Sequence, residues 1–339
     1  MIYRTLLALL VFCWIAPVHA AAPAKSEAPK AEKYKIYMIL YRGMTDAEKG
    51  FLFHLKNRNI PVDIVTRDCN KDVSKVSEYI TEIRSMKPDL IYAFGTSVAA
   101  KLVGLEGKVN PREHITDIPV IFNIVADPVG AKLVSNLKSS GRNLTGATHL
   151  VPLEGQFKGF KTVMDFKRLG FVYTPNEKNA VLILEKVKEL SKGMGFEVLP
   201  APITPDADGK IAESAVEPIM KQLVQKKADA VFFPSDSSII SNIQSLAKVT
   251  MDHRLPSFSA TEEPVRKAGV MMGVVNSYFN VGQLAGYKAE QILVKKIKPQ
   301  DVPIETLNRS TFLIDMKTAK SFDIYPPVMV LKFAEVISQ

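Results

Sequence analysis

Residues that could do chemistry gather in six short turns, each of which follows an apolar run. Their side chains are mostly hydroxyls, amides or carboxylates, with aromatic residues nearby. Such turns suit ligand binding because helix N-termini at the carboxyl ends of parallel strands present free backbone N–H groups. A site of this kind fits a small polar ligand with an apolar portion. The turns are residues 41–45, 95–97, 126–128, 174–176, 234–238 and 260–262.

Two aspartates in these turns have a structural alternative to ligand contact. Asp127 precedes Pro128, a pair typical of a helix N-cap followed by proline at the first helical position, so capping is favoured. Asp236 can cap a helix or contact a ligand. Its two roles stay equally open because Ser237 or Ser238 could cap the helix instead.

Three other side chains also keep alternatives. Thr96 and Ser97 lie between a strand and a helix, where their hydroxyls can cap the helix or face an anion, and neither role is preferred. Arg42 can pair with a ligand carboxylate or lie on the surface, and the surface position is slightly favoured.

Enzyme signatures are missing from the sequence. The five histidines show no metal-ligand spacing, and there is no HExxH, Walker A or GxGxxG motif. Residues 95–99 resemble a nucleophile elbow around Ser97, but Ala99 stands where that motif has glycine, and no histidine partner is evident. We therefore expect no catalytic residue, no metal and no cofactor, and a serine hydrolase is disfavoured.

The N-terminus reads as a secretory signal peptide. Arg4 precedes an apolar stretch over residues 6–16, and Val18 and Ala20 supply the small residues of a cleavage site. Pro17 interrupts the stretch well short of the roughly 20 apolar residues of a membrane span. We expect cleavage after Ala20, export to the periplasm and, over residues 21–33, a disordered tether rich in Ala, Pro, Lys and Glu.

Composition narrows the remaining classes. The formal net charge is +9, and loss of Arg4 with the signal peptide leaves +8. Lysines alternate with acids, as over residues 185–189, and form no focused basic patch, so nucleic-acid binding is disfavoured. The mature chain keeps only Cys69 and can form no internal disulfide. With 339 residues and 47% hydrophobic content, the chain can bury a large core, by its length in two domains.

Short apolar runs alternate with segments of helical period, which predicts an α/β fold. The runs are apolar throughout, as in parallel sheets covered on both faces. Expected strands are 36–40, 62–66, 90–94, 120–125, 170–173, 197–199, 230–233, 257–259 and 270–275. Expected helices are 46–57, 73–86, 177–192, 213–226, 238–252 and 282–296.

The order of elements indicates two similar halves. Residues 89–97 align with residues 229–237, each a strand led by Asp and followed by a small polar turn. Crossovers between the halves are expected at 144–152, which holds Thr148, and at 274–279 and 305–312. This predicts two Rossmann-like lobes joined by a hinge, with a cleft at the strand ends. The first lobe takes residues 34–147 plus 277–324, the second 148–276, and 325–339 form a C-terminal tail.

Five stretches resemble the ABC-transporter substrate-binding family that includes tryptophan- and tyrosine-type binding proteins. They are IPVIFNIVADPVG (118–130), GRNLTG (141–146), GFVYTPNEKN (170–179), FPSDS (233–237) and YFNVG (278–282), within a resemblance over 35–324. The resemblance implies a type I periplasmic-binding fold that closes on its ligand and delivers it to a membrane ABC permease driven by a separate ATPase. We also expect a monomer. It also implies a cleft lined by Thr96, Ser97, Asp127, Asn179 and Asp236 and by the crossover near Asn276.

The chain departs from the family pattern at two places. Residues 41–46 lack the His-Pro stretch of many relatives, and Asn276 stands where many have an acidic residue. Both departures argue against an aromatic amino acid, and the expected ligand is a small polar metabolite such as an amino acid or a related compound. The alternative function is a ligand-sensing module for a membrane receptor. The candidate ligand-binding residues are Tyr41, Arg42, Thr96, Ser97, Asp127, Thr148, Asn176, Asn179, Asp236, Thr261 and Asn276.

Overall fold

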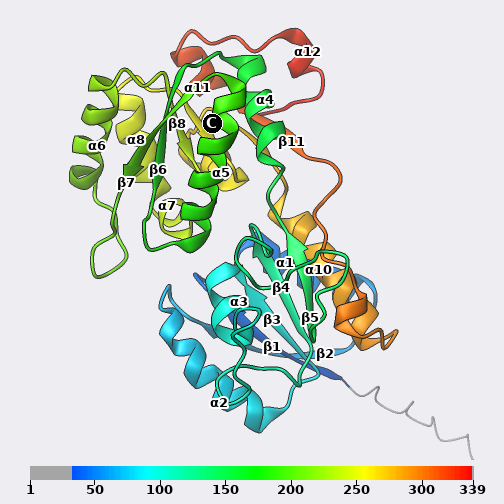
Figure 1. Cartoon of the computed structure of the whole chain (residues 1–339). Coiled ribbons are helices and arrows are strands. Elements are labelled where there is room, and N and C mark those ends of the chain that lie inside the picture. The colour runs from blue at the N-terminus through cyan, green and yellow to red at the C-terminus, as the bar shows by residue number, and fades with distance from the viewer. Residues whose placement is uncertain (1–32, 338–339) are drawn as a thin grey trace, which may run out of the picture. The chain divides into compact units, whose positions relative to one another are not determined.

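The computed structural model describes residues 33–337, in which the strands form two sheets (Figure 1). One sheet has five strands and the other has seven, with helices between most strands, so the predicted α/β class is correct. No helix in this range combines the length and the apolar character that a membrane span requires. The expected signal peptide and the expected tether lie outside the described residues, apart from Lys33.

The first sheet is wholly parallel, with the strand order β2-β1-β3-β4-β5. Strands β3 and β4 are buried along their full length. Such burial follows from helices on both faces of a parallel sheet. We call this sheet and its helices the first lobe. Its strands are β1 (Tyr34–Leu40), β2 (Val62–Asp68), β3 (Leu90–Phe94), β4 (Val120–Val125) and β5 (Leu144–Thr148); its helices are α1 (Asp46–Asn57), α2 (Val76–Met86), α3 (Gly95–Val103) and α10 (Tyr278–Leu293).

Helices α1 and α10 pack closely in the first lobe, although they are far apart in the sequence (Figure 1). Two glycines make this approach possible. A Cβ atom on Gly50 would lie 1.9 Å from the carbonyl oxygen of Phe279, and one on Gly282 would lie 1.9 Å from the carbonyl oxygen of Ala47. Both distances are far below any allowed contact, so the backbones touch where side chains would otherwise separate them.

The second sheet follows the order β12-β11-β10-β9-β8-β6-β7 and is parallel except between β10 and β11. Its core holds a cluster of buried phenylalanines, among which Phe160 and Phe258 stack with ring centroids 4.6 Å apart. We call this sheet and its helices the second lobe. Its strands are β6 (Arg168–Tyr173), β7 (Glu197–Pro202), β8 (Ala230–Phe233), β9 (Ser257–Ser259), β10 (Met272–Val275), β11 (Thr311–Asp315) and β12 (Glu335–Ile337); its helices are α4 (Leu153–Val163), α5 (Lys178–Met194), α6 (Glu213–Gln225), α7 (Ser237–Ser241), α8 (Ile243–Asp252), α9 (Glu262–Ala268), α11 (Met316–Ser321) and α12 (Val328–Leu331).

Most expected elements are present, with two local differences. The expected helix over 73–86 begins as a 3₁₀ turn (Val73–Lys75) before α2. The expected helix over 238–252 is interrupted at Asn242, which separates α7 from α8. The Asn242 side chain donates to the carbonyl oxygens of Gly209 and Ser238 and accepts from the Ile211 N–H. These bonds tie the break to the loop before α6.

Two of the expected crossovers include strand residues. Residues 144–148 form β5, the edge strand that pairs with β4. Residues 311–315 form β11, which pairs with β10 in the second sheet. The range 277–324, which the sequence assigned to the first lobe, is therefore divided. Helix α10 packs on α1 of the first lobe, whereas β11 and α11 belong to the second sheet and its cover, and β12 of the expected tail pairs with β11.

Candidate functional site

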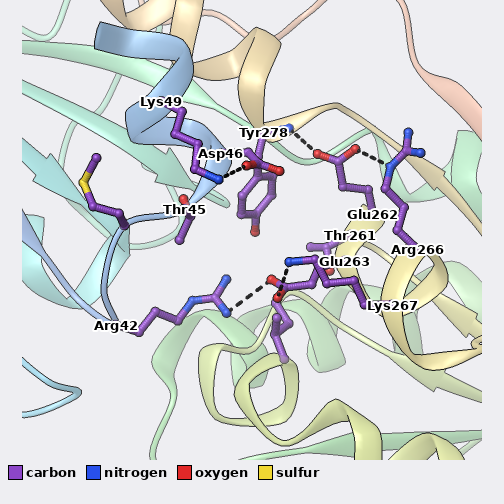
Figure 2. A pocket seen from close by; sticks show the side chains of 12 residues that line it. Arg42, Thr45, Asp46, Lys49, Thr261, Glu262, Glu263, Arg266, Lys267 and Tyr278 are labelled. Atoms are coloured by element: carbon purple, nitrogen blue, oxygen red, sulfur yellow. Dashed lines mark hydrogen bonds and ion pairs between the residues drawn. The ribbon is translucent and has the colours of Figure 1, made fainter.

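Two adjoining cavities lie where strands of both sheets end. The larger, of about 160 Å³, is lined by the turn after β1, the first turn of α1 and α9 (Figure 2). The smaller, of about 20 Å³, is lined by the turns after β1, β3, β6 and β8. Arg42, Ile240 and Tyr278 line both cavities and so join them. The carboxyl ends of parallel strands are the expected place for a ligand in such sheets.

Arg42 is largely buried between the two cavities. Its side chain is 7% exposed, and its guanidinium carbon lies 6.0 Å from the centre of the Phe94 ring. One terminal nitrogen is 3.6 Å from Oε2 of Glu263, beyond hydrogen-bond distance. Nε is buried and has no hydrogen-bond partner within residues 33–337. The slight preference for a surface Arg42 was wrong, because Phe94 and Glu263 cover the side chain.

The first turn of α3 lies beside Arg42 in the smaller cavity. No side chain in the described part of the chain caps this helix, so the hydroxyls of Thr96 and Ser97 do not serve as its N-cap. Both residues line the smaller cavity. Gly95 has a φ of +80°, a backbone conformation that glycine adopts without strain. An uncapped helix N-terminus attracts an anion through its free N–H groups and its partial positive charge.

Asp236 is fully buried and caps α7. Its Oδ1 accepts from the Ile239 N–H at 2.9 Å and from the Thr174 hydroxyl at 3.2 Å, and its Oδ2 accepts from the Thr174 N–H at 2.7 Å. Burial, and then the nearby Glu177 carboxylate, raise the pKa of Asp236 to about 7. Of the two roles that the sequence left open, the structure shows capping, and Asp236 lines neither cavity.

Glu177 is a cavity residue that sequence reasoning missed. Its carboxylate accepts from the Ser237 N–H at 3.1 Å and from the Ser238 N–H at 2.8 Å, and it lines the smaller cavity. It therefore shares the first turn of α7 with Asp236. The sequence feature that could have identified Glu177 is its position just before α5, in a turn rich in polar residues.

Asp127 lies in a different place. Its Oδ1 accepts from the Gly130 N–H at 2.9 Å, and its Oδ2 pairs with Lys186. It lines a separate cavity of about 390 Å³ with residues of the segment 150–154 and of α5. The favoured role of Asp127 as a helix N-cap was wrong, because no helix begins at Pro128 in the described part of the chain and the Gly130 contact closes a turn instead. The side chain does not join the Arg42 group.

The remaining candidates divide between the cavities and the crossovers. Tyr41 and Asn179 line the smaller cavity, where the Asn179 amide donates to the carbonyl oxygen of Ser235 at 2.6 Å, and Thr261 lines the larger one. The other three candidates, Thr148, Asn176 and Asn276, line neither of these two cavities. The Thr148 N–H donates to the Glu305 carbonyl oxygen at 2.8 Å, and the Asn276 amide donates to the Thr306 hydroxyl at 3.1 Å. Asn176 is exposed.

His149 is a second residue that sequence reasoning missed. It is fully buried, and its Nε2 lies 2.7 Å from Oγ of Ser235, which lines the smaller cavity. Burial and the positive charge of Arg42 lower the pKa of His149 to about 3. A histidine with so low a pKa is a poor general base.

Glu262 fixes the start of α10 at the rim of the larger cavity. Its Oε1 accepts from the Tyr278 N–H at 2.7 Å, and its Oε2 lies 3.0 Å from Nε of Arg266 (Figure 2). The first turn of α9 thereby holds Tyr278, whose ring lies edge-on to His149 at 5.5 Å. The ring is a rigid, mostly apolar wall shared by both cavities.

Comparisons with known proteins agree with this architecture. A curated tyrosine-binding protein from Clostridioides difficile is 26% identical over 308 residues, which cover 88% of this chain and 83% of that protein. A solved domain from Streptococcus pneumonia in complex with L-Trp has a TM-score of 0.77 and 24% identity, covering 90% of this chain and 100% of that one.

A further solved structure, a conserved domain protein from Vibrio cholerae, has a TM-score of 0.78 and 23% identity over 90% of this chain and 99% of its own. These similarities confirm the predicted fold, two lobes with mainly parallel sheets of the type I periplasmic-binding class. The family model described as ABC transporter substrate binding protein matches residues 36–337. The chain therefore belongs to the ABC transporter substrate-binding protein family.

Proposed function

We propose that this protein is the extracytoplasmic solute-binding component of an ABC importer and that its ligand is a small carboxylate-bearing metabolite, with amino acids as the first class. The carrying observation is the buried Arg42, whose Nε has no hydrogen-bond partner among residues 33–337, beside the N-terminus of α3, which no side chain in that range caps. A guanidinium binds a carboxylate through two parallel N–H···O bonds, and such charge-assisted bonds are stronger than neutral ones. A carboxylate in the smaller cavity would satisfy Arg42 and the first turn of α3 together.

The remainder of the cavity lining favours an apolar portion on the ligand. Half of the residues that line the smaller cavity are polar or charged, and most of the others are apolar or aromatic, so the site suits a polar ligand with an apolar portion. The relatives named for tyrosine and L-Trp place aromatic amino acids first in the panel to be tested. The departures at residues 41–46 and at Asn276 place other apolar amino acids second. The apolar lining residues are Tyr41, Phe94, Val98, Ile124, Ile240 and Tyr278.

Both lobes supply residues to the cavities, and this supports capture by hinge closure. Arg42 and α3 come from the first lobe, whereas Asn179, Ile240 and Thr261 come from the second. A ligand that touches both lobes stabilises the state in which they are together, because only that state makes all the contacts. The closed protein would then present the ligand to a membrane permease coupled to an ATPase. We place the mature protein in the periplasm, as a monomer without catalytic activity.

A thermal-shift panel tests this proposal. The mature chain is heated with each L-amino acid, with small carboxylic acids, and with the amides of tyrosine and tryptophan, which lack the carboxylate. A ligand at about 100 times its Kd adds about 2.7 kcal/mol to the free energy of unfolding, and this should raise Tm by about 5 °C. At least one acid should shift Tm, and its amide should not. No shift with any acid, or equal shifts with acid and amide, would contradict the proposal.

Uptake then separates import from sensing. The amino acid that gives the largest shift is supplied in radiolabelled form to cells that carry or lack the gene. Loss of uptake without the gene supports import. Unchanged uptake across a range of low ligand concentrations would favour the sensing module instead.

A further inference from the structure

Glu263 lies beside the Arg42 guanidinium in the lining of the larger cavity. The two residues come from different lobes, Arg42 from the turn after β1 and Glu263 from the first turn of α9 (Figure 2). Their closest nitrogen and oxygen are 3.6 Å apart, so the charges attract but form no hydrogen bond. Arg42 thus has a compensating charge nearby and still keeps its hydrogen-bonding capacity.

Glu263 also has a second cationic partner within reach. Oε1 of Glu263 lies 3.3 Å from Nζ of Lys267, one helical turn further along α9. Because residues four apart share one face of a helix, this pair persists without Arg42. The Glu263 side chain is 34% exposed, so water can also solvate it. Release of Arg42 therefore leaves no buried charge behind on the second lobe.

The two contacts of Arg42 differ in strength. A partly exposed ion pair at 3.6 Å contributes about 0.2–1 kcal/mol, whereas a bidentate carboxylate on a buried guanidinium is among the strongest hydrogen-bonded pairs in proteins. A ligand carboxylate can therefore displace Glu263. A neutral amide or hydroxyl on a ligand would displace the negative charge of Glu263 from Arg42 without supplying another.

We propose, on the basis of the function proposed above, that Glu263 is an internal competitor of the ligand. It neutralises Arg42 in the ligand-free protein and is exchanged for the ligand carboxylate on binding. Glu263 then acts as a specificity determinant. It lowers the affinity for every ligand that uses Arg42, and it makes a full negative charge on the ligand a condition for binding.

The test compares Glu263→Gln with the wild type and with Glu213→Gln. Glu213 also lies in the first turn of a helix of the second lobe and pairs with an exposed lysine, Lys248, but it lines neither cavity. It therefore controls for the loss of one negative charge and of one helix-dipole contact. A fourth protein carries Glu263→Gln together with Arg42→Gln. The probes are L-tyrosine, measured by calorimetry, and sodium acetate, measured as a Tm shift against sodium chloride at equal ionic strength.

Glu263→Gln should bind the carboxylate probes about two- to five-fold more tightly than the wild type, which is the range that a weak, partly exposed ion pair can supply. Glu213→Gln should match the wild type, and the double variant should lose the gain. Acetate serves as a probe whatever the natural ligand is. Equal affinities in Glu263→Gln and the wild type, an equal gain in Glu213→Gln, or no response to either probe in any variant would overturn the inference. If the amino-acid panel shifts Tm but Glu263→Gln behaves as the wild type, only this inference fails; if the panel fails, the proposed function fails.

Discussion

Nε2 of His149 and Oγ of Ser235 lie 2.7 Å apart and join the segment after β5 to the turn after β8. The bond is buried at the point where the chain passes from the first sheet to the second. Ser235 in turn lies in the wall of the smaller cavity and accepts the Asn179 amide through its carbonyl oxygen. The crossover is thereby tied to the cavity wall by a histidine that burial keeps neutral.

The neutral His149 predicts a specific pH dependence of stability. Its pKa is about 3 in the folded protein and about 6.5 in the unfolded chain, so below pH 6.5 the unfolded chain binds a proton that the folded protein does not. The stabilising contribution of His149 is present above pH 6.5 and is lost as the pH falls towards 3. His149→Gln cannot titrate. Between pH 6.5 and pH 5, the free energy of unfolding of the wild type should therefore fall by about 2 kcal/mol relative to the variant, measured by urea denaturation.

Asp236 supplies the control, because its shift has the opposite sign. Its folded pKa is raised to about 7 from an ordinary value of 3.8, so its contribution is present below pH 3.8 and is lost as the pH rises through 7. The two groups oppose each other near pH 5.5, and the wild type alone shows little slope there. Asp236→Asn should change the slope in the opposite direction to His149→Gln. Equal slopes in all three proteins would show that neither group is shifted.

The fold was more predictable than the site because apolar runs report burial directly. The strand at 90–94 and the helix at 46–57 have the predicted bounds, since the first is apolar throughout and the second has a capping box at Thr45. Strand β5 was missed because its residues, Leu-Thr-Gly-Ala-Thr, include glycine and two threonines and do not form a continuous apolar run. Its burial comes from the β4 edge against which it lies.

The site depended on tertiary contacts that no local pattern contains. Nothing near Arg42 in the sequence indicates that Phe94 and Glu263 cover its side chain. Asp236 and Asp127 each have a local partner three residues away, but both also contact partners that lie 62 and 59 residues away, Thr174 and Lys186. Four of the six expected turns, 41–45, 95–97, 234–238 and 260–262, contribute to the two joined cavities, because strand ends can be recognised in the sequence, but the contacts of individual side chains cannot.

The contact between α1 and α10 predicts that a single methyl group will destabilise the protein. Gly282→Ala should lower the free energy of unfolding by about 2 kcal/mol or more, because the new Cβ would overlap the Ala47 carbonyl and the two helices would have to separate. Gly193→Ala is the matched control. Gly193 lies within α5 with nothing within 4 Å of an added Cβ, so alanine should stabilise the protein by about 0.5–1 kcal/mol. If the two variants unfold at the same urea concentration, the close contact of Gly282 with Ala47 is not needed for the packing of α10 on α1.

We expect a substitution of Asp127 to leave the affinity for the ligand unchanged. Asp127→Asn keeps an oxygen that can accept from the Gly130 N–H and removes only the charge that pairs with Lys186. The pair is partly exposed, so stability should fall by less than about 1 kcal/mol. Affinity for the ligand found in the panel should stay within about twofold of the wild type, because Asp127 lines neither of the two joined cavities. A loss of tenfold or more in calorimetry would place Asp127 in the site after all.

Arg42 predicts opposite effects on stability and on binding. A buried charge whose nearest opposite charge is 3.6 Å away costs free energy in the ligand-free protein, so Arg42→Gln should leave Tm unchanged or raise it. The same change should weaken binding of the panel ligand about 30-fold or more, because loss of one partner of a buried ion pair costs about 2 kcal/mol at least. Arg42→Lys keeps the charge but cannot form two parallel bonds to a carboxylate. Its affinity for the ligand should therefore lie between those of the wild type and Arg42→Gln. Calorimetry and thermal unfolding of the three proteins decide the matter. A variant that loses stability and affinity together would assign Arg42 to the structure of the cleft, whereas loss of affinity alone assigns it to the ligand.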